Sequence, residues 1–157
     1  MIQIIAVGKL KEKATKTLVD EYLKRLQPYS KTEIVEVSDE PNNSEVEAEE
    51  LRVKKIEGER ILRQIKKDSY VILLDLRGKE MSSPKLAEKI SEINTYHASN
   101  ITFIIGGSLG VSDEVVKRAD LLLKLSEMTF PHNLVRILIL EQIYRAYKIL
   151  NHEPYHK

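Results

Sequence analysis

Short apolar runs alternate along the chain with segments in which apolar residues recur every three or four positions. Five runs are rich in Ile, Val and Leu, as the strands of a buried parallel sheet are. These predicted strands are "IQIIAV" (2–7), "IVEV" (34–37), "YVILLDL" (70–76), "ITFIIGG" (101–107) and "LLLKLS" (121–126). Helical patterns follow each of them, the last over residues 133–150. The alternation predicts an α/β fold with a doubly wound, mostly parallel sheet.

Three serines mark expected starts of helices. Ser44 with Glu47 three residues later has the pattern of a capping box. Ser83 followed by Pro84 suits an N-cap with a proline in the first turn. Ser112 precedes two acidic residues, which are favourable at the positive end of a helix dipole.

The composition is that of an ordinary globular chain, with 42% hydrophobic and 31% charged residues. A length of 157 residues fits a single domain over residues 1–157. No apolar stretch approaches the roughly 20 residues of a membrane span, and the N-terminus does not resemble a signal peptide. The absence of cysteine excludes disulfides and thiolate metal sites. These features predict a cytoplasmic protein with no membrane segment.

The net charge of +1 conceals a segregation along the chain. Residues 33–50 contain eight acidic residues and no basic one, whereas residues 9–31 contain seven basic residues against three acidic. From residue 117 to the end there are seven Lys or Arg against four Asp or Glu. Such runs form solvated faces in many proteins, and they also suit a surface that binds a polyanion.

Three unusual loops follow the third, fourth and fifth predicted strands: "LDLRGKEMSS", "GGSLG" and "SEMTFPH". In doubly wound sheets ligands bind beyond the carboxyl ends of the strands, so these loops are expected to converge. They contain no phosphate-binding loop, no metal cluster and no Ser-His-Asp set. Gly106 and Gly107 suit a tight turn as well as a ligand site, and Met128 and Phe130 suit a core as well as a cavity wall. Together the loops favour a flat heterocycle such as adenine, held by backbone and apolar contacts.

Five stretches together resemble one family: "AVGKLKE" (6–12), "IIGGSLG" (104–110), "SEMTFPH" (126–132), "EQIYRAYKI" (141–149) and the closing "PYHK". The combination resembles the bacterial pseudouridine N3-methyltransferases of large-subunit ribosomal RNA. These are small members of the SPOUT class of S-adenosylmethionine-dependent methyltransferases. The resemblance spans the whole chain, and "MTFPH" with a terminal "YHK" makes it specific.

The resemblance implies a C-terminal trefoil knot, a homodimer whose active site needs both subunits, and bound S-adenosylmethionine. It implies as substrate a pseudouridine of ribosomal RNA, presented by an assembled ribosome. The cofactor contacts that it implies are Leu74, Gly106, Leu125, Ser126, Glu127, Met128, Thr129 and Phe130. Glu127 departs from the family, where Lys or Gln is usual. A carboxylate there would weaken RNA binding if its side chain pointed towards the substrate.

Methyl transfer from a sulfonium to nitrogen needs no metal, because proximity and orientation lower much of the barrier. The imide N3 must lose a proton. Candidates to assist are His132, Tyr155 and His156, with Arg136 or Lys157 stabilising negative charge or holding phosphate.

The alternatives are a non-catalytic, flavodoxin-like nucleotide- or RNA-binding module and a phosphate-handling enzyme of the same architecture. The first gives no reason for "MTFPH" or for the aromatic and basic tail. The second lacks a phosphate loop. A solvated, frayed tail is the ordinary structure of chain termini, and it remains the alternative to a catalytic one.

Overall fold

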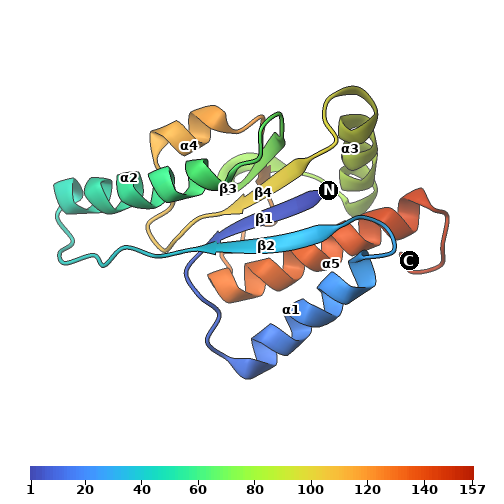
Figure 1. The fold of residues 1–157 in the computed structure, drawn as a ribbon, viewed down its shortest axis with the longest axis horizontal. Coiled ribbons are helices and arrows are strands. Elements are labelled where there is room, and N and C mark those ends of the chain that lie inside the picture. The colour runs from blue at the N-terminus through green and yellow to red at the C-terminus, as the bar shows by residue number, and fades with distance from the viewer.

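A computed structural model describes residues 1–157. Five strands alternate with five helices, as the sequence pattern predicts (Figure 1). In chain order they are β1 (Ile2–Val7), α1 (Lys13–Leu26), β2 (Thr32–Val37), α2 (Glu47–Gln64), β3 (Tyr70–Glu80), α3 (Ser83–Tyr96), β4 (Ile101–Ile105), α4 (Asp113–Arg118), β5 (Leu121–Lys124) and α5 (His132–Leu150).

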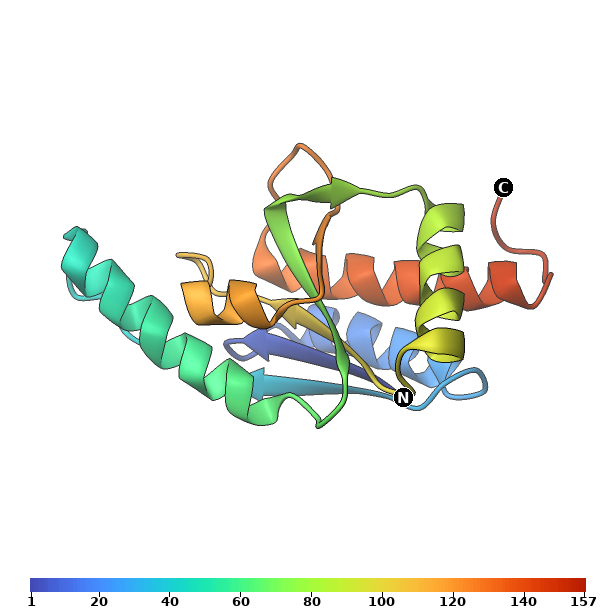
Figure 2. The ribbon, with the colours of Figure 1, turned by 90° about the horizontal axis from the view of Figure 1, so that it is seen from above.

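The strands form one sheet in the order β2-β1-β4-β3-β5, and every neighbouring pair is parallel. The chain therefore winds in both directions from β1, and the predicted doubly wound α/β fold is confirmed. Figure 2 shows that β3 turns sharply before it leads into α3. At this turn the pairing with β5 shifts register, because Leu74 and Lys79 both lie opposite Leu123.

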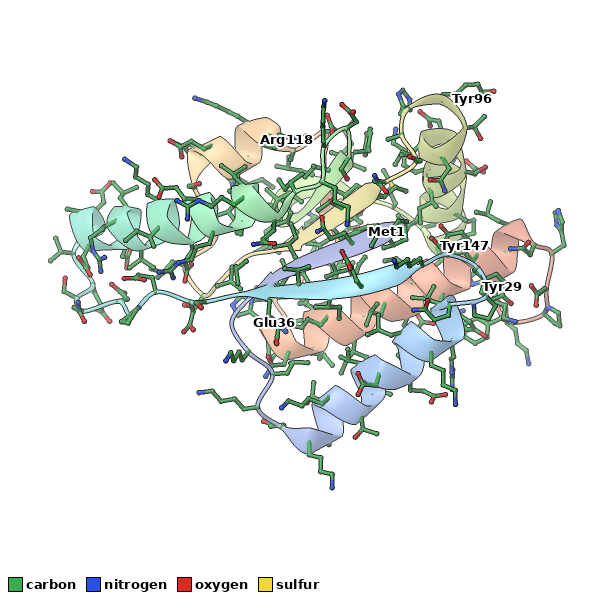
Figure 3. All side chains as sticks on the ribbon, in the orientation of Figure 1. Met1, Tyr29, Glu36, Tyr96, Arg118 and Tyr147 are labelled. Atoms are coloured by element: carbon green, nitrogen blue, oxygen red, sulfur yellow. The ribbon has the colours of Figure 1, made fainter.

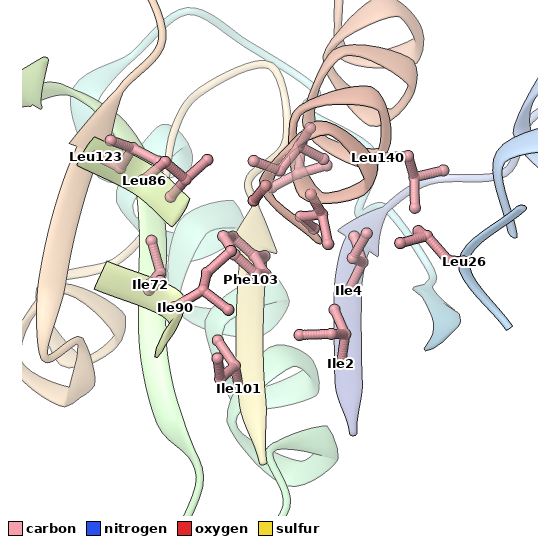
Figure 4. Close-up of a cluster of buried hydrophobic side chains, with 14 of the residues drawn as sticks. Ile2, Ile4, Leu26, Ile72, Leu86, Ile90, Ile101, Phe103, Leu123 and Leu140 are labelled. Atoms are coloured by element: carbon pink, nitrogen blue, oxygen red, sulfur yellow. The ribbon is translucent and has the colours of Figure 1, made fainter. Parts of the chain in front are cut away.

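The two faces of the sheet carry separate apolar clusters, because alternate residues of a strand point to opposite sides. On one face Ile2, Ile4 and Phe103 pack with residues of α1, α3 and α5 (Figure 4). On the other face Ile5 and Ile104 pack with residues of α2 and α4. All six residues of β1 are buried, which explains why all of them except Gln3 are apolar.

Two expected helix starts are wrong. The helix predicted from Ser44 begins at Glu47, with Val46 at the N-cap, and the Ser44 hydroxyl instead accepts from the Val46 N–H at 3.3 Å. The side chain that caps α3 belongs to Ser82, one residue before the predicted Ser83, and it accepts from the backbone N–H of residue 85. In both places several small polar residues compete, and tertiary contacts decide among them.

Candidate active site

A cavity of about 510 Å³ lies where β4 and β5 end and where β3 shifts its register against β5. The three stretches singled out in the sequence converge on it, although the first of them, after residue 74, is still part of β3: the lining includes residues 74–77, 105–111 and most of 123–130. The beginning of α5 closes the cavity with His132 and Val135. The site thus lies at the carboxyl edge of the sheet, where open α/β sheets bind ligands.

Seven of the eight predicted cofactor contacts line this cavity: Leu74, Gly106, Leu125, Ser126, Met128, Thr129 and Phe130. The eighth, Glu127, does not. Its carboxylate is 81% exposed and forms an ion pair with Lys124, three residues earlier. The Glu127 carboxylate, which departs from the family pattern, is therefore paired at the surface and does not face the cavity.

The glycine turn after β4 is a tight turn that also faces the cavity. The Gly110 N–H donates to the Gly107 carbonyl at 3.1 Å, and Gly110 has a φ of +89°. A Cβ on Gly106 would lie 2.7 Å from a methyl of Val111, which belongs to the same turn. Gly106 therefore contributes only backbone to the cavity, and any side chain there would press on the turn itself.

Glu57 of α2 is a buried carboxyl that sequence reasoning missed. It is 5% exposed and lies behind the glycine turn, where its Oε1 is 2.7 Å from the position of a Cβ on Gly107. Its Oε2 accepts from the Glu40 N–H at 3.0 Å. Burial raises the pKa of Glu57 above its usual value. The helical period was the signal that could have found it, because the buried, apolar Val53 and Ile61 lie four residues before and after Glu57 and place it on the buried face of α2.

Asp75 provides an ionised carboxylate at the rim of the cavity. It accepts three hydrogen bonds of 2.8 Å from Arg77, two from the guanidinium and one from the backbone N–H. The guanidinium bonds are the main cause of a lowered pKa for Asp75. The cavity therefore combines apolar walls and bare backbone with the Asp75–Arg77 ion pair at one edge.

His132, a predicted catalytic residue, is the first residue of α5 and lines the cavity. It is half-buried. Burial, together with the positive charge of Arg136, lowers the pKa of its imidazole. His132 is therefore held neutral near pH 7, which leaves one ring nitrogen able to accept a proton.

Arg136 lies one turn further along α5 and does not line the cavity. It is 1% exposed and reaches to the end of β1, where it donates to the carbonyls of Gly8 at 2.7 Å and Val7 at 3.3 Å. It also forms an ion pair of 2.6 Å with Glu36 of β2. Its Nε has no partner. The Arg136 guanidinium therefore fastens α5 to the sheet.

The C-terminal tail, with the predicted residues Tyr155, His156 and Lys157, folds back on the far end of α5. The Tyr155 hydroxyl lies 3.2 Å from Glu141, and its ring packs edge-on against Tyr144. Tyr29 donates to both carboxylate oxygens of Glu153, which fastens the tail to the end of α1 (Figure 3). Lys157 is exposed.

The cavity of one chain lies at the beginning of α5, whereas the tail contacts the helix at Glu141, Tyr144 and Arg145, 9 to 13 residues after His132. At 1.5 Å per residue these contacts lie about 14 to 20 Å along the helix from His132. The structure thus brings His132 together with the cofactor-contact residues and leaves the three tail residues apart from them.

No group of three or more His, Asp or Glu side chains is placed to hold a metal ion. None of the helices has the length and apolar character needed to cross a bilayer.

An α/β sheet of this order, with its cavity beside three neighbouring strands at the carboxyl edge, is typical of proteins that bind a nucleotide or a cofactor. A family model described as "Predicted SPOUT methyltransferase" matches residues 1–156. The chain therefore belongs to the SPOUT methyltransferase family, which decides against the non-catalytic module.

The chain is 53% identical over 158 residues to the ribosomal RNA large subunit methyltransferase H 1 of Clostridium perfringens. It is 56% identical over 159 residues to the ribosomal RNA large subunit methyltransferase H of Carboxydothermus hydrogenoformans. Each match covers 99% of both chains. A solved structure from Haemophilus influenzae, titled a probable methylase family protein, has the same fold, with a TM-score of 0.55 at 15% identity. That match covers 99% of this chain and 70% of the other.

Proposed function

We propose that the protein transfers a methyl group from S-adenosylmethionine to N3 of a pseudouridine in large-subunit ribosomal RNA. It acts in the cytoplasm as a homodimer, on the assembled ribosome. The observation that carries the proposal is the cavity beside β3, β4 and β5 at the carboxyl edge of the sheet, in a chain more than half identical to enzymes named for methylating this RNA.

The cavity suits S-adenosylmethionine in size and in chemistry. A volume of about 510 Å³ is within the usual range for a cofactor site. Leu74, Leu125 and Phe130 offer apolar walls for an adenosine, and the glycine turn offers backbone groups. The carboxylate of Asp75 at the rim, held in place by Arg77, offers a hydrogen-bond acceptor to the amino group of the cofactor. When bound, the cofactor supplies a methyl group that is already electrophilic.

The protein must then hold the target base and accept its N3 proton. His132 is the best-placed acceptor, because it faces the cavity and burial keeps its imidazole neutral. Arg136 is a weaker candidate for a catalytic role, because its hydrogen bonds are made to β1 and to Glu36. Its contribution is to keep the first turn of α5, and with it His132, in place.

The tail of a second copy supplies the RNA side of the site. Within one chain no tail residue lines the cavity, because Tyr155 and His156 are held at Glu141 and Arg145, about 14 to 20 Å along α5 from His132, so a shared site requires two chains. Arg145 lies 3.1 Å from Nδ1 of His156, and a guanidinium can only donate. Nδ1 is therefore the acceptor and the proton of a neutral His156 is on Nε2. His156 then donates to a base carbonyl, Tyr155 stacks and Lys157 binds phosphate.

The experiment is complementation between two inactive chains. One lacks residues 155–157. The other carries Thr129→Trp, which fills the cavity from an exposed loop position without disturbing the core. Each alone should be inactive on ribosomes in a radioactive methyl-transfer assay. Mixed dimers should recover roughly a quarter of wild-type activity, since half the dimers are hybrids with one working site of two.

Glu127→Trp is the matched control, because it adds the same side chain two residues away, outside the cavity. It should leave cofactor binding by calorimetry unchanged, whereas Thr129→Trp should abolish it. Mixed dimers that form and remain inactive would refute the shared site. Equal methylation of RNA with uridine in place of the pseudouridine would refute the proposed substrate.

A further inference from the structure

The connection between β1 and α1, together with the first turn of α1, displays four lysines with no ion-pair partners. Lys9, Lys11, Lys13 and Lys16 are all exposed, and none forms an ion pair, although fifteen ion pairs occur elsewhere. Glu12 is the only carboxylate among residues 8–16, here called the lysine loop. Four positive charges and one negative leave the lysine loop with a net charge of +3.

The backbone of the lysine loop is fastened at its start. Gly8 has a φ of +92°, and its N–H donates to the Val37 carbonyl at 2.8 Å while its carbonyl accepts from Arg136 at 2.7 Å. Leu10 is buried, and its N–H donates to Glu36 at 2.8 Å. These anchors hold the first lysines in a fixed position, so less conformational entropy is lost when they bind a ligand.

The anchoring charges do not offset the lysines. The Glu36 carboxylate is already paired with the buried Arg136, so the pair contributes no net charge. Burial alone would raise the pKa of Glu36, but the hydrogen bonds from Arg136 and from the Leu10 N–H outweigh it and lower that pKa. The exposed surface of the lysine loop therefore stays positive at neutral pH.

The lysine loop lies beside the cavity at the same edge of the sheet. It follows β1, which pairs with β4 so that Ala6 lies opposite Ile105, just before the glycine turn. A methyl of Val7 is 3.2 Å from the position of a Cβ on Gly107. Figure 3 shows labelled Glu36, whose carboxylate holds Leu10, at this end of the sheet. A large substrate whose base enters the cavity would extend over this surface.

We propose that the lysine loop binds the phosphate backbone of the RNA whose target base enters the cavity. The inference rests on the proposed function and adds the place where the RNA docks. Four exposed cations spread over eight residues do not converge on one small anion, which favours a polyanion with regularly spaced charges. Contacts to phosphate hold the RNA in register and carry no sequence information of their own.

The test compares two double variants with the same change in net charge. Lys9→Gln/Lys11→Gln removes charge from the lysine loop. Lys31→Gln/Lys67→Gln removes it from two exposed, unpaired lysines at the opposite edge, just before β2 and β3. Affinity is measured against salt concentration with fluorescently labelled protein, on whole bacterial ribosomes and on a stem-loop RNA with a pseudouridine in its loop.

The slope of log affinity against log salt should fall in magnitude by about 1.4 to 1.8 for the lysine-loop variant, because each lost phosphate contact removes about 0.7 to 0.9. The control variant should keep the wild-type slope. S-adenosylmethionine affinity should be unchanged in both.

An unchanged slope in the lysine-loop variant would overturn the inference. An equal loss in the control variant would also overturn it, because net charge alone would then explain the effect. If the lysine-loop variant binds ribosomes more weakly but binds the stem-loop RNA as wild type does, the inference is also overturned, because the lysine loop then contacts a ribosomal protein instead of RNA. A wild-type protein that binds RNA through the lysine loop but methylates none would refute the proposed function and leave this inference intact.

Discussion

Replacing Gly78 with alanine should destabilise the fold at the crossing of β3 and β5. Gly78 lies within the register shift between Leu74 and Lys79. A Cβ at this position would lie 2.5 Å from the carbonyl carbon and oxygen of Leu122 and 2.7 Å from the nitrogen of Leu123. Contacts this short do not occur, and the obstructing atoms are backbone, so no side-chain rotation can relieve them.

The two strands must therefore move apart, and the energy follows from that movement. Forcing an extra carbon into a close-packed contact costs about 1 to 3 kcal/mol. Loss of one hydrogen bond between the strands adds roughly 1 kcal/mol. Alanine restricts the unfolded chain more than glycine does, and this offsets about 0.4 to 1 kcal/mol of the loss. The net loss in the free energy of unfolding should be about 1 to 4 kcal/mol.

Urea denaturation followed by circular dichroism measures this loss. Gly110→Ala is the control, because Gly110 has a φ of +89° and open space around its Cβ position. Its free energy of unfolding should fall only by the roughly 1 to 2 kcal/mol that a residue with a side chain costs in the left-handed conformation, because the added methyl meets no other atom. A Gly78→Ala protein within about 0.5 kcal/mol of wild type, the usual range of neutral surface changes, would refute the reasoning.

Two further predictions concern the anchors of α5 and of the tail. Because the pKa of Glu36 is lower in the folded protein than its usual 4.5, the carboxylate stabilises the fold above that pH, and the gain is lost as pH falls through the lower value. Glu36→Gln should therefore destabilise the protein at pH 7 in urea denaturation and progressively less below pH 4.5; a pH-independent difference would contradict this. Tyr29→Phe removes two hydrogen bonds to Glu153 and should speed hydrogen exchange at residues 151–153 several-fold, with β4 as the unchanged reference.

The pattern of apolar residues predicts the sheet well because its central strands are buried on both faces. β1 and β4 contain only buried residues, and their sequences are nearly all apolar. The end of β3 was missed for the opposite reason. Residues 77–80 are polar and mostly exposed, and they are part of a strand only because β5 pairs with them after the register shift. Such a pairing depends on a distant segment, and no local pattern reports it.

The candidate site was predictable where it depends on topology and unpredictable where it depends on tertiary contacts. The three loops could be placed together because the carboxyl ends of parallel strands share one edge. The sequence does not predict which way individual side chains point. Arg136 follows the cavity residue His132 by one helical turn and was predicted to stabilise negative charge or hold phosphate, yet its guanidinium donates to the end of β1. Glu127 follows a cavity residue directly, yet it pairs with Lys124 at the surface.

Helix α5 fixes the distance between the cavity and the tail of one chain. Its first residue, His132, lines the cavity, Arg136 fixes that end to β1, and Tyr144, twelve residues after His132, holds the tail. A helix rotates by about 100° per residue, so adding or removing one residue between Arg136 and Tyr144 would turn one part of the helix away from its contacts. The tail of one chain is therefore held at a fixed place on α5, outside the cavity of that chain. The proposed shared site combines this tail with the cavity of a second copy for that reason.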